Sequence, residues 1–222
     1  MKILSAIFFI ALYACSAVDR DTDINAEIYQ GYRFEYNEAT NKTIISAVFK
    51  TDSEDGKVIR LSAPALFTVN DEFCNYCDTA DYPYVLSYTS RLPEAVMDLV
   101  DFEKNEYINR VELDSLFPVK DFYAAVDSVS HEVKVSFSGS ELYDGEKLML
   151  EVSAGEKKVS YDISEKKDNV FRISDKILKD FAGKTVCMKL SRIRTIELYE
   201  VSPAGGEVQL VYSSKIKEVE LP

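Results

Sequence analysis

Residues 32–49, YRFEYNEATNKTIISAVF, decide the fold, because two alternating runs lie close together within this short stretch. Apolar or aromatic side chains occupy every second position from Tyr32 to Tyr36 and again from Ile45 to Phe49. Successive side chains of a β-strand point to opposite faces of the sheet, so a period of two predicts strands with one buried face. Turn-forming residues bound both runs, as expected for half-buried strands.

The same period continues along most of the chain. Further alternating runs lie at residues 58–61, 66–69, 84–88, 107–113, 133–137, 148–152, 159–163, 186–190, 208–212 and 216–221. Asp55-Gly56 and Asp144-Gly145 stand between such runs and are typical of β-hairpin turns. The sequence therefore predicts a mostly β protein.

Two short segments are predicted to be helical instead. The first follows Pro93, which suits a first helical turn, and its apolar residues as far as Val100 share one helix face. The second spans residues 174–182, with Ser174 as N-cap and Gly183 as C-terminal stop. We therefore expect one or two short helices among the strands.

A weak internal repeat indicates two domains. Each half of the chain has an Asp-Gly turn between alternating strands, and each half ends on a similar strand, VEL at residues 111–113 and again at 219–221. Division near residue 120 gives β-sandwich domains at 27–118 and 119–222, each close to the roughly 100 residues of an immunoglobulin-like sandwich. A single larger sandwich or barrel is the alternative.

The first fifteen residues form a targeting segment rather than part of the fold. Lys2 provides a positive start, and residues 3–13 are apolar apart from Ser5. This run is too short for a permanent membrane span, which needs about 20 apolar residues.

The end of that segment, Leu12-Tyr13-Ala14-Cys15, resembles the lipobox of bacterial lipoproteins. The resemblance implies that the Cys15 thiol is acylated, that the preceding peptide is removed, and that the mature chain is attached to a membrane. Ser16 stands where an inner-membrane retention signal of this family would have Asp, which implies the outer membrane of a Gram-negative cell. Tyr13 departs from the small residue that is usual at its position. Together with the strand pattern, the chain resembles lipoproteins built from tandem immunoglobulin-like domains.

Under this interpretation, residues 1–14 are the signal peptide and residues 15–26 are a polar tether between lipid and fold. Stable attachment needs more than one acyl chain, which the family's modification supplies. The alternative is an ordinary secretory signal cut after Ala17, which would give a secreted or periplasmic protein.

The charge of the chain argues against one class of partner. The 222 residues carry a formal net charge of -12 at pH 7. Such a surface repels the phosphate backbone of nucleic acids. We therefore expect no nucleic-acid partner, and the acidity itself favours solubility.

Cys74 and Cys77 are the most conspicuous pair of reactive side chains. Structural zinc would need a second pair or histidines, and His131 is the only histidine. A thioredoxin-like redox centre would need a strand-to-helix context that the following residues do not offer. In an oxidising compartment, the pair predicts a small structural disulfide, with metal, redox and reduced-thiol roles as alternatives. Cys187 lies in an apolar strand and is predicted to be a small buried side chain.

Other candidates for chemistry are weak. No nucleophile elbow or phosphate-binding glycine loop is present, and His131 has no recognisable catalytic partners. Acidic residues are abundant, so a carboxylate pair for glycoside chemistry stays open. Tyr76, Tyr82 and Tyr84 lie near the cysteine pair, where they form a candidate binding surface or pack in the core.

These observations predict a non-enzymatic, membrane-anchored cell-envelope lipoprotein that acts as a binding or structural interaction module. We expect no cofactor and no metal. Its partner would be another envelope protein or a surface glycan. The alternatives are an envelope hydrolase on a β scaffold and a metal-dependent binding module.

Overall fold

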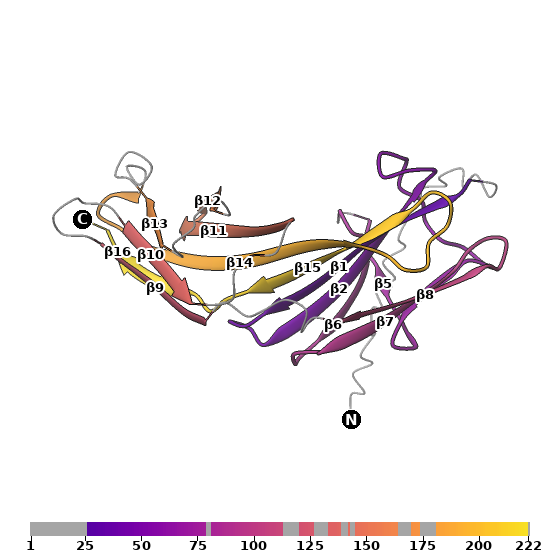
Figure 1. The fold of residues 1–222 in the computed structure, drawn as a ribbon, viewed down its shortest axis with the longest axis horizontal. Helices are drawn as coiled ribbons and strands as arrows, with labels where there is room; N and C mark the ends of the chain where they lie inside the picture. Colours follow the sequence, from indigo (N-terminus) through magenta and orange to yellow (C-terminus); the bar gives the residue numbers. More distant parts are fainter. Residues whose placement is uncertain are drawn as a thin grey trace, which may run out of the picture.

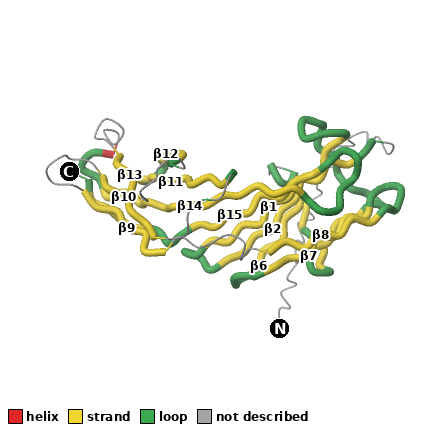
Figure 2. The backbone as a smooth tube through the Cα atoms, viewed as in Figure 1, coloured by secondary structure: helices red, strands yellow, loops and turns green. Residues whose placement is uncertain are grey.

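A computed structural model describes residues 26–78, 81–112, 120–126, 133–138, 142, 145–163, 170–173 and 181–221. β-Strands dominate these residues (Figures 1 and 2), which confirms the prediction of a mostly β protein. The strands are β1 (Ile28–Asn37), β2 (Lys42–Thr51), β3 (Leu66–Val69), β4 (Glu72–Phe73), β5 (Asn75–Tyr76), β6 (Tyr84–Tyr88), β7 (Glu94–Val100), β8 (Glu106–Glu112), β9 (Lys120–Val126), β10 (Val133–Ser138), β11 (Glu146–Ala154), β12 (Lys157–Asp162), β13 (Val170–Ile173), β14 (Thr185–Glu197), β15 (Gly206–Ser213) and β16 (Lys217–Glu220).

The described strands form three sheets. The largest has the order β12-β11-β14-β15-β1-β2-β6-β5, with β16 also paired to β14. A four-stranded sheet has the order β4-β3-β7-β8, and a three-stranded sheet has the order β13-β10-β9. The large sheet runs along the whole molecule, and the two smaller sheets lie at its opposite ends (Figure 1). The fold is therefore sandwich-like at both ends.

Aromatic side chains fill the layer between the large sheet and the four-stranded sheet. The ring of Tyr32 on β1 stacks on Phe67 of β3 with 5.4 Å between ring centroids. Phe49 of β2 meets the same Phe67 ring edge-on at 5.2 Å. Phe34 and Ile45 are also fully buried, so the alternating residues between positions 32 and 49 do mark the core face.

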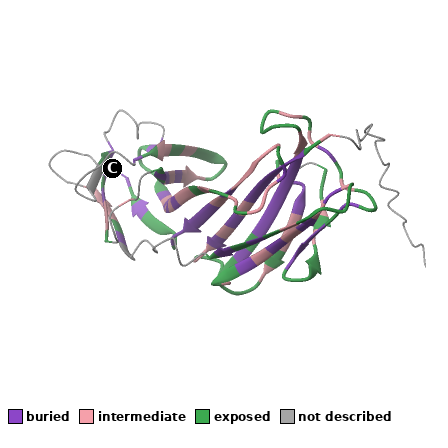
Figure 3. Ribbon diagram, turned by 45° about the vertical axis from the view of Figure 1, so that its right-hand side comes forward, coloured by how far each residue is buried: buried purple, intermediate pink, exposed green. Residues whose placement is uncertain are grey.

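The three-stranded sheet closes the other end in the same way. Phe122 of β9 and Val135 of β10 are buried, and they belong to the same core cluster as Leu148 of β11 and Leu190 of β14. Figure 3 shows the buried residues concentrated along the long sheet. One continuous apolar core therefore joins both ends.

β15 and β1 connect the two halves of the chain. They pair in parallel from Gln30 opposite Gly206 to Asn37 opposite Ser213, whereas every other pairing among the described strands is antiparallel. The two sandwich layers thus share a sheet, which the alternation pattern did not predict. The predicted boundary between residues 118 and 119 lies outside the described residues and stays a prediction.

The helix predicted after Pro93 is wrong, because this segment is strand β7. Ala95, Met97 and Leu99 are fully buried, with less buried residues between them. β7 pairs with β3 on one side and β8 on the other, so tertiary pairing overrides a spacing that also fits a helix. The second predicted helix, at 174–182, lies outside the described residues except for its last two positions.

Candidate functional site

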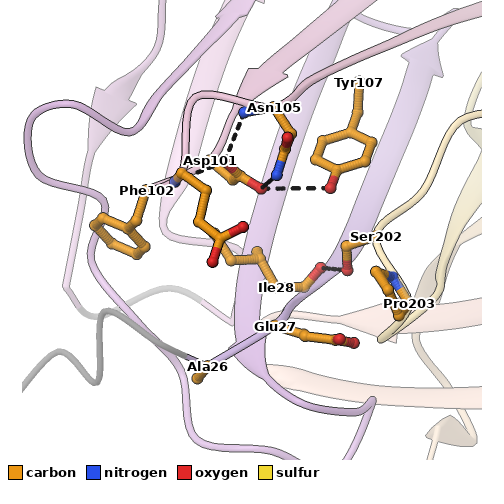
Figure 4. Close-up of a pocket in the computed structure, with 10 residues that line it drawn as sticks. Ala26, Glu27, Ile28, Asp101, Phe102, Asn105, Tyr107, Ser202 and Pro203 are labelled. Atoms are coloured by element: carbon orange, nitrogen blue, oxygen red, sulfur yellow. Dashed lines mark hydrogen bonds between the residues drawn. The ribbon is translucent and has the colours of Figure 1, made fainter.

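A cleft opens where the start of β1, the β7–β8 loop and the β14–β15 loop meet (Figure 4). Its volume is 410 Å³. Its walls are formed by Ala26, Glu27, Ile28, Asp101, Phe102, Glu103, Asn105, Tyr107, Ser202 and Pro203.

The Asp101 carboxylate in this cleft accepts hydrogen bonds from the β7–β8 loop and the start of β8. Its Oδ1 accepts hydrogen bonds from the backbone N–H groups of Glu103 and Asn105, both at 2.8 Å. Its Oδ2 accepts one from Asn105 Nδ2 at 2.8 Å and one from the Tyr107 hydroxyl at 3.3 Å. Because four donors surround it, Asp101 acts as the organiser of a turn rather than as an available base.

Ser202, on the opposite wall of the cleft, is also hydrogen-bonded to the backbone. Ser202 Oγ donates to the carbonyl oxygen of Ile28 at 2.6 Å and accepts from the backbone N–H of Ala204 at 3.1 Å. Burial, followed by the charge of Asp101, raises the pKa of Tyr107, so its phenol stays protonated at neutral pH. Asp101 and Ser202 therefore stabilise the chain segments that form the cleft, while the carboxylates of Glu27 and Glu103 also line it.

A different surface is open and apolar. The inward side chains of the four-stranded sheet, such as Phe67, Met97 and Leu99, are in the core, so their neighbours along each strand form the outer face. We call this surface the Asp98 face. Its centre consists of Leu66, Thr68, Phe73, Val96, Asp98, Val100 and Ile108, and the register adds the charged residues Glu94, Glu106, Arg110 and Glu112 around it.

The strand register places four of these residues in one row across the sheet. Thr68 pairs with Phe73 on one side and with Asp98 on the other, and Asp98 pairs with Ile108. Phe73 is 72% exposed and Ile108 is 43% exposed, and Leu66 beside this row is 36% exposed. Large apolar side chains that are open to water around a central acid are typical of an interaction surface.

Asp98 is the chemically unusual residue of this face. Its Oδ1 is shielded from water and has no hydrogen-bond partner among the residues that the structure describes. Burial raises the pKa of this carboxyl, and the nearby carboxylates of Glu106 and Asp71 raise it further. A carboxylate with one shielded oxygen and like charges nearby is stabilised by a cation.

The basic residue on this face already has a partner. Arg110 lies two residues after Ile108 on β8, and its guanidinium is 3.6 Å from the carboxylate of Glu94. The two side chains are largely exposed and belong to neighbouring strands. Arg110 therefore neutralises Glu94, and the charge near Asp98 remains acidic.

The three predicted binding tyrosines lie in different surroundings. Tyr84 is buried at 8% exposure, and its hydroxyl accepts a hydrogen bond from the backbone N–H of Leu61. Tyr76 is half-buried, with the Arg60 guanidinium 4.6 Å from its ring centroid. Tyr82 is half-buried, and burial raises the pKa of its phenol. Tyr84 is thus a core residue, and binding by Tyr76 and Tyr82 stays a prediction.

The predicted disulfide between Cys74 and Cys77 is wrong, because no bond joins these thiols. The reason is strand β5, which occupies the two residues between them. Three steps of extended chain span roughly 10 Å, whereas the Cα atoms of a disulfide lie within about 7 Å. Cys74 also packs against the core while Cys77 is exposed.

The other candidates from the sequence add little. Cys187 is half-buried rather than buried. Cys15 and His131 lie outside the described residues. Among the residues that the structure does describe, no group of three or more His, Cys, Asp or Glu side chains is arranged to hold a metal ion.

Local sequence pattern does not predict the Asp98 face. A helix after Pro93 would not pair with the strands that carry Thr68 and Ile108. It would also place Asp98 on a different face from Val96 and Val100, because residues on one helix face are three or four positions apart. Assigning the segment as a strand would have placed Val96, Asp98 and Val100 together on one face.

The sequence was compared with protein families and with curated proteins. No family model matches the sequence, and no curated protein matches it. In the described part of the chain, no helix is both long enough and apolar enough to cross a membrane.

Proposed function

We propose that this protein is a non-enzymatic interaction module of the cell envelope, attached to the membrane by a lipid on Cys15. The observation that carries the proposal is the Asp98 face, an open sheet surface with exposed Phe73 and Ile108 around an acid. The lipobox supports the membrane attachment, and the alternating strand pattern supports the β-rich module.

The physical advantage of such an arrangement is local concentration. Two or three acyl chains hold a protein stably at a membrane, and a polar tether lets the folded part sample the space above it. A binding face confined in this way meets a partner in the same envelope far more often than a freely diffusing one. The long sheet would then act as a spacer.

Two polar side chains of the cleft, Asp101 and Ser202, are poor candidates for hydrolase chemistry. A general base needs a lone pair that can reach a substrate proton, but Asp101 already accepts four hydrogen bonds. Ser202 Oγ donates its proton to the Ile28 carbonyl oxygen, so this hydroxyl is not activated by a base in the structure.

The first test is the intact mass of the protein extracted from membranes of a lipoprotein-processing bacterium, compared with a Cys15→Ser variant. We expect a chain that begins at Cys15 and carries acyl groups, and we expect the variant to lack them and leave the membrane fraction. An unacylated mature chain in the wild type would contradict the anchor.

The second test addresses binding in the native membrane. A photo-crosslinking amino acid at Phe73 should give a discrete crosslinked product, whereas one at Tyr123 should not. Tyr123 is a matched control because it is also aromatic, 60% exposed and on a strand, but lies on β9 at the other end. Turnover of a hydrolase substrate that is lost in Asp101→Asn, with the fold intact, would contradict the proposal.

A further inference from the structure

We propose that the Asp98 face binds a polypeptide segment in which a lysine or arginine stands between apolar side chains, with the cation paired to Asp98. This inference rests on the proposed binding function and specifies the chemistry of the partner.

The central carboxylate determines the charge of the partner. Asp98 Oδ1 is shielded from water and has no donor among the described residues, although Asp98 lies in the middle of an otherwise open face. An ammonium or guanidinium group beside the part of the Asp98 side chain that stays open would supply the opposite charge, although the shielded Oδ1 itself would stay out of its reach. Hydrogen bonds between ionised groups are the strong ones, and they gain strength when water is excluded.

The surroundings of Asp98 determine the rest of the partner. Phe73 and Ile108 stand on either side of Asp98 in the same row, and Leu66 and Val100 form the next row. Binding of apolar side chains against this frame would bury surface that is now open to water, and would enclose the ion pair. A simple cation would leave this apolar frame uncovered.

The charges nearby argue against two other occupants. A second copy of the chain, docked face to face about a two-fold axis, would bring Asp98 and Glu106 against their own counterparts. An anionic membrane surface would meet the carboxylates of Asp71 and Glu106, which lie close enough to Asp98 to raise its pKa. Charge complementarity therefore selects a basic polypeptide.

Arg110 on the same face does not fill this role. It lies beside Val96 in the register and pairs with Glu94 at 3.6 Å, at the far side of the row from Glu106. Arg110 is thus paired with Glu94 at the edge of the face, and Asp98 at its centre is left for a partner.

The test uses the mature chain with Cys15→Ser, which needs no detergent, and a random peptide library displayed on phage. We expect the wild-type face to enrich peptides with Lys or Arg flanked by apolar residues. The synthetic form of an enriched peptide should bind saturably by calorimetry, and Asp98→Asn should weaken it by about tenfold or more. Phe73→Ser should weaken it by a similar factor.

The matched control is Glu156→Gln, which removes a charge from the exposed β11–β12 turn at the other end of the molecule. Its affinity should stay within about twofold of the wild type, since distant sites act independently. A library without basic enrichment, equal binding by Asp98→Asn, or binding of anionic vesicles instead of peptides would overturn the proposal. If photo-crosslinking at Phe73 succeeds and the library fails, the interaction module stands and only the basic partner is rejected.

Discussion

A carboxylate that loses water without gaining a hydrogen-bond partner lowers the stability of a folded chain. Asp98 has one such oxygen, Oδ1, and its position between Thr68 and Ile108 would suit a threonine or valine better. A residue that costs stability at the centre of an open face is typical of a functional site rather than a structural one.

We therefore expect Asp98→Asn to raise the free energy of unfolding at pH 7 by about 1 kcal/mol. Because burial raises the pKa of Asp98 in the folded state, the folded chain binds this proton more tightly than the unfolded chain. The penalty is therefore absent below the unfolded pKa of about 3.9 and grows as the pH rises through the folded pKa. Urea unfolding at pH 7 and near pH 4 should show the advantage of the variant shrinking at low pH. A less stable variant at pH 7 would contradict this account.

Arg192 and Glu146, in contrast to Asp98, form a buried ion pair in which each charge faces an opposite one. Nε and Nη2 of Arg192 donate to Glu146 Oε2 at 3.0 Å and 2.5 Å, and both side chains are almost completely buried. Removing one partner leaves a charge in the core, so Glu146→Ala should cost about 3–5 kcal/mol in chemical unfolding.

The control for this pair is Lys158→Ala, which breaks a more exposed contact of 2.6 Å to Glu151. It should cost less than about 1 kcal/mol. The double change Glu146→Leu with Arg192→Met should recover most of the loss. If Glu146→Ala is as mild as Lys158→Ala, the buried pair does not hold the β11–β14 contact.

Among the elements, the β14–β15 loop is held against strand β8 by the buried amide of Asn109 and by a 2.8 Å hydrogen bond from the Ile108 backbone N–H to Glu200 Oε2. Asn109 Oδ1 accepts from the backbone N–H groups of Tyr199 and Glu200, both at 3.0 Å, and its Nδ2 donates to the Glu200 carbonyl oxygen at 2.7 Å. The loop displays Tyr199 with 94% of its surface exposed.

Asn109→Ala should therefore release this loop while leaving both sandwich layers folded. We expect faster amide hydrogen exchange at residues 198–205 and a loss of about 1–3 kcal/mol in stability. Thr195→Ala, on the outer part of β14, should leave exchange in the loop unchanged. Unaltered exchange in Asn109→Ala would show that other contacts position the loop.

Strand β5 separates two cysteines that are close in sequence but different in reactivity. Burial raises the pKa of the Cys74 thiol to about 12, so almost none of it is thiolate at pH 8, whereas Cys77 is exposed. We expect iodoacetamide to label Cys77 without reductant and to leave Cys74 unmodified until the chain is unfolded. Mass spectrometry of tryptic peptides measures this. If both residues resist labelling until a reductant is added, a disulfide joins them and this expectation is wrong.

The same scale shows what local sequence could and could not predict. Alternation in β1 and β2 predicted the strands correctly, because a period of two has no helical equivalent over that length. It predicted one buried face, whereas residues 45–49 of β2 are buried on both faces. In β7, the apolar residues Val96, Leu99 and Val100 fit a helix as well as a strand, and only pairing with β3 and β8 decides between them. The Asp98 face depends on that pairing, so it could not be predicted from local pattern.

At the scale of the whole molecule, the parallel pairing of β1 with β15 is the least predictable feature. The two strands come from opposite ends of the described chain, and no short turn joins them to signal the contact. Gly206 is required at this seam, because a Cβ atom there would lie 2.7 Å from the Gln30 carbonyl oxygen. The sequence pattern located both strands but contains no information about which edges meet.

This pairing predicts that the first half of the chain does not fold alone. Residues 27–118 lack β15, so one edge of β1 would be unpaired and the buried side chains of Val208, Leu210 and Tyr212 would be missing from the core. At about 2 kcal/mol for each buried apolar side chain, the loss is a large part of the 5–15 kcal/mol that stabilises a typical domain.

We expect this fragment to aggregate or to lack a cooperative thermal transition by circular dichroism, whereas residues 27–222 should unfold cooperatively. Adding a synthetic peptide of residues 198–216 should recover part of the transition, because it supplies β15 in trans and pairs with the open edge of β1. A Gly206→Val peptide is the matched control, since its side chain would collide with the backbone at Gln30. Cooperative unfolding of residues 27–118 without any peptide would show that this half is an independent domain. The pairing of β1 with β15 would then not be needed for it to fold.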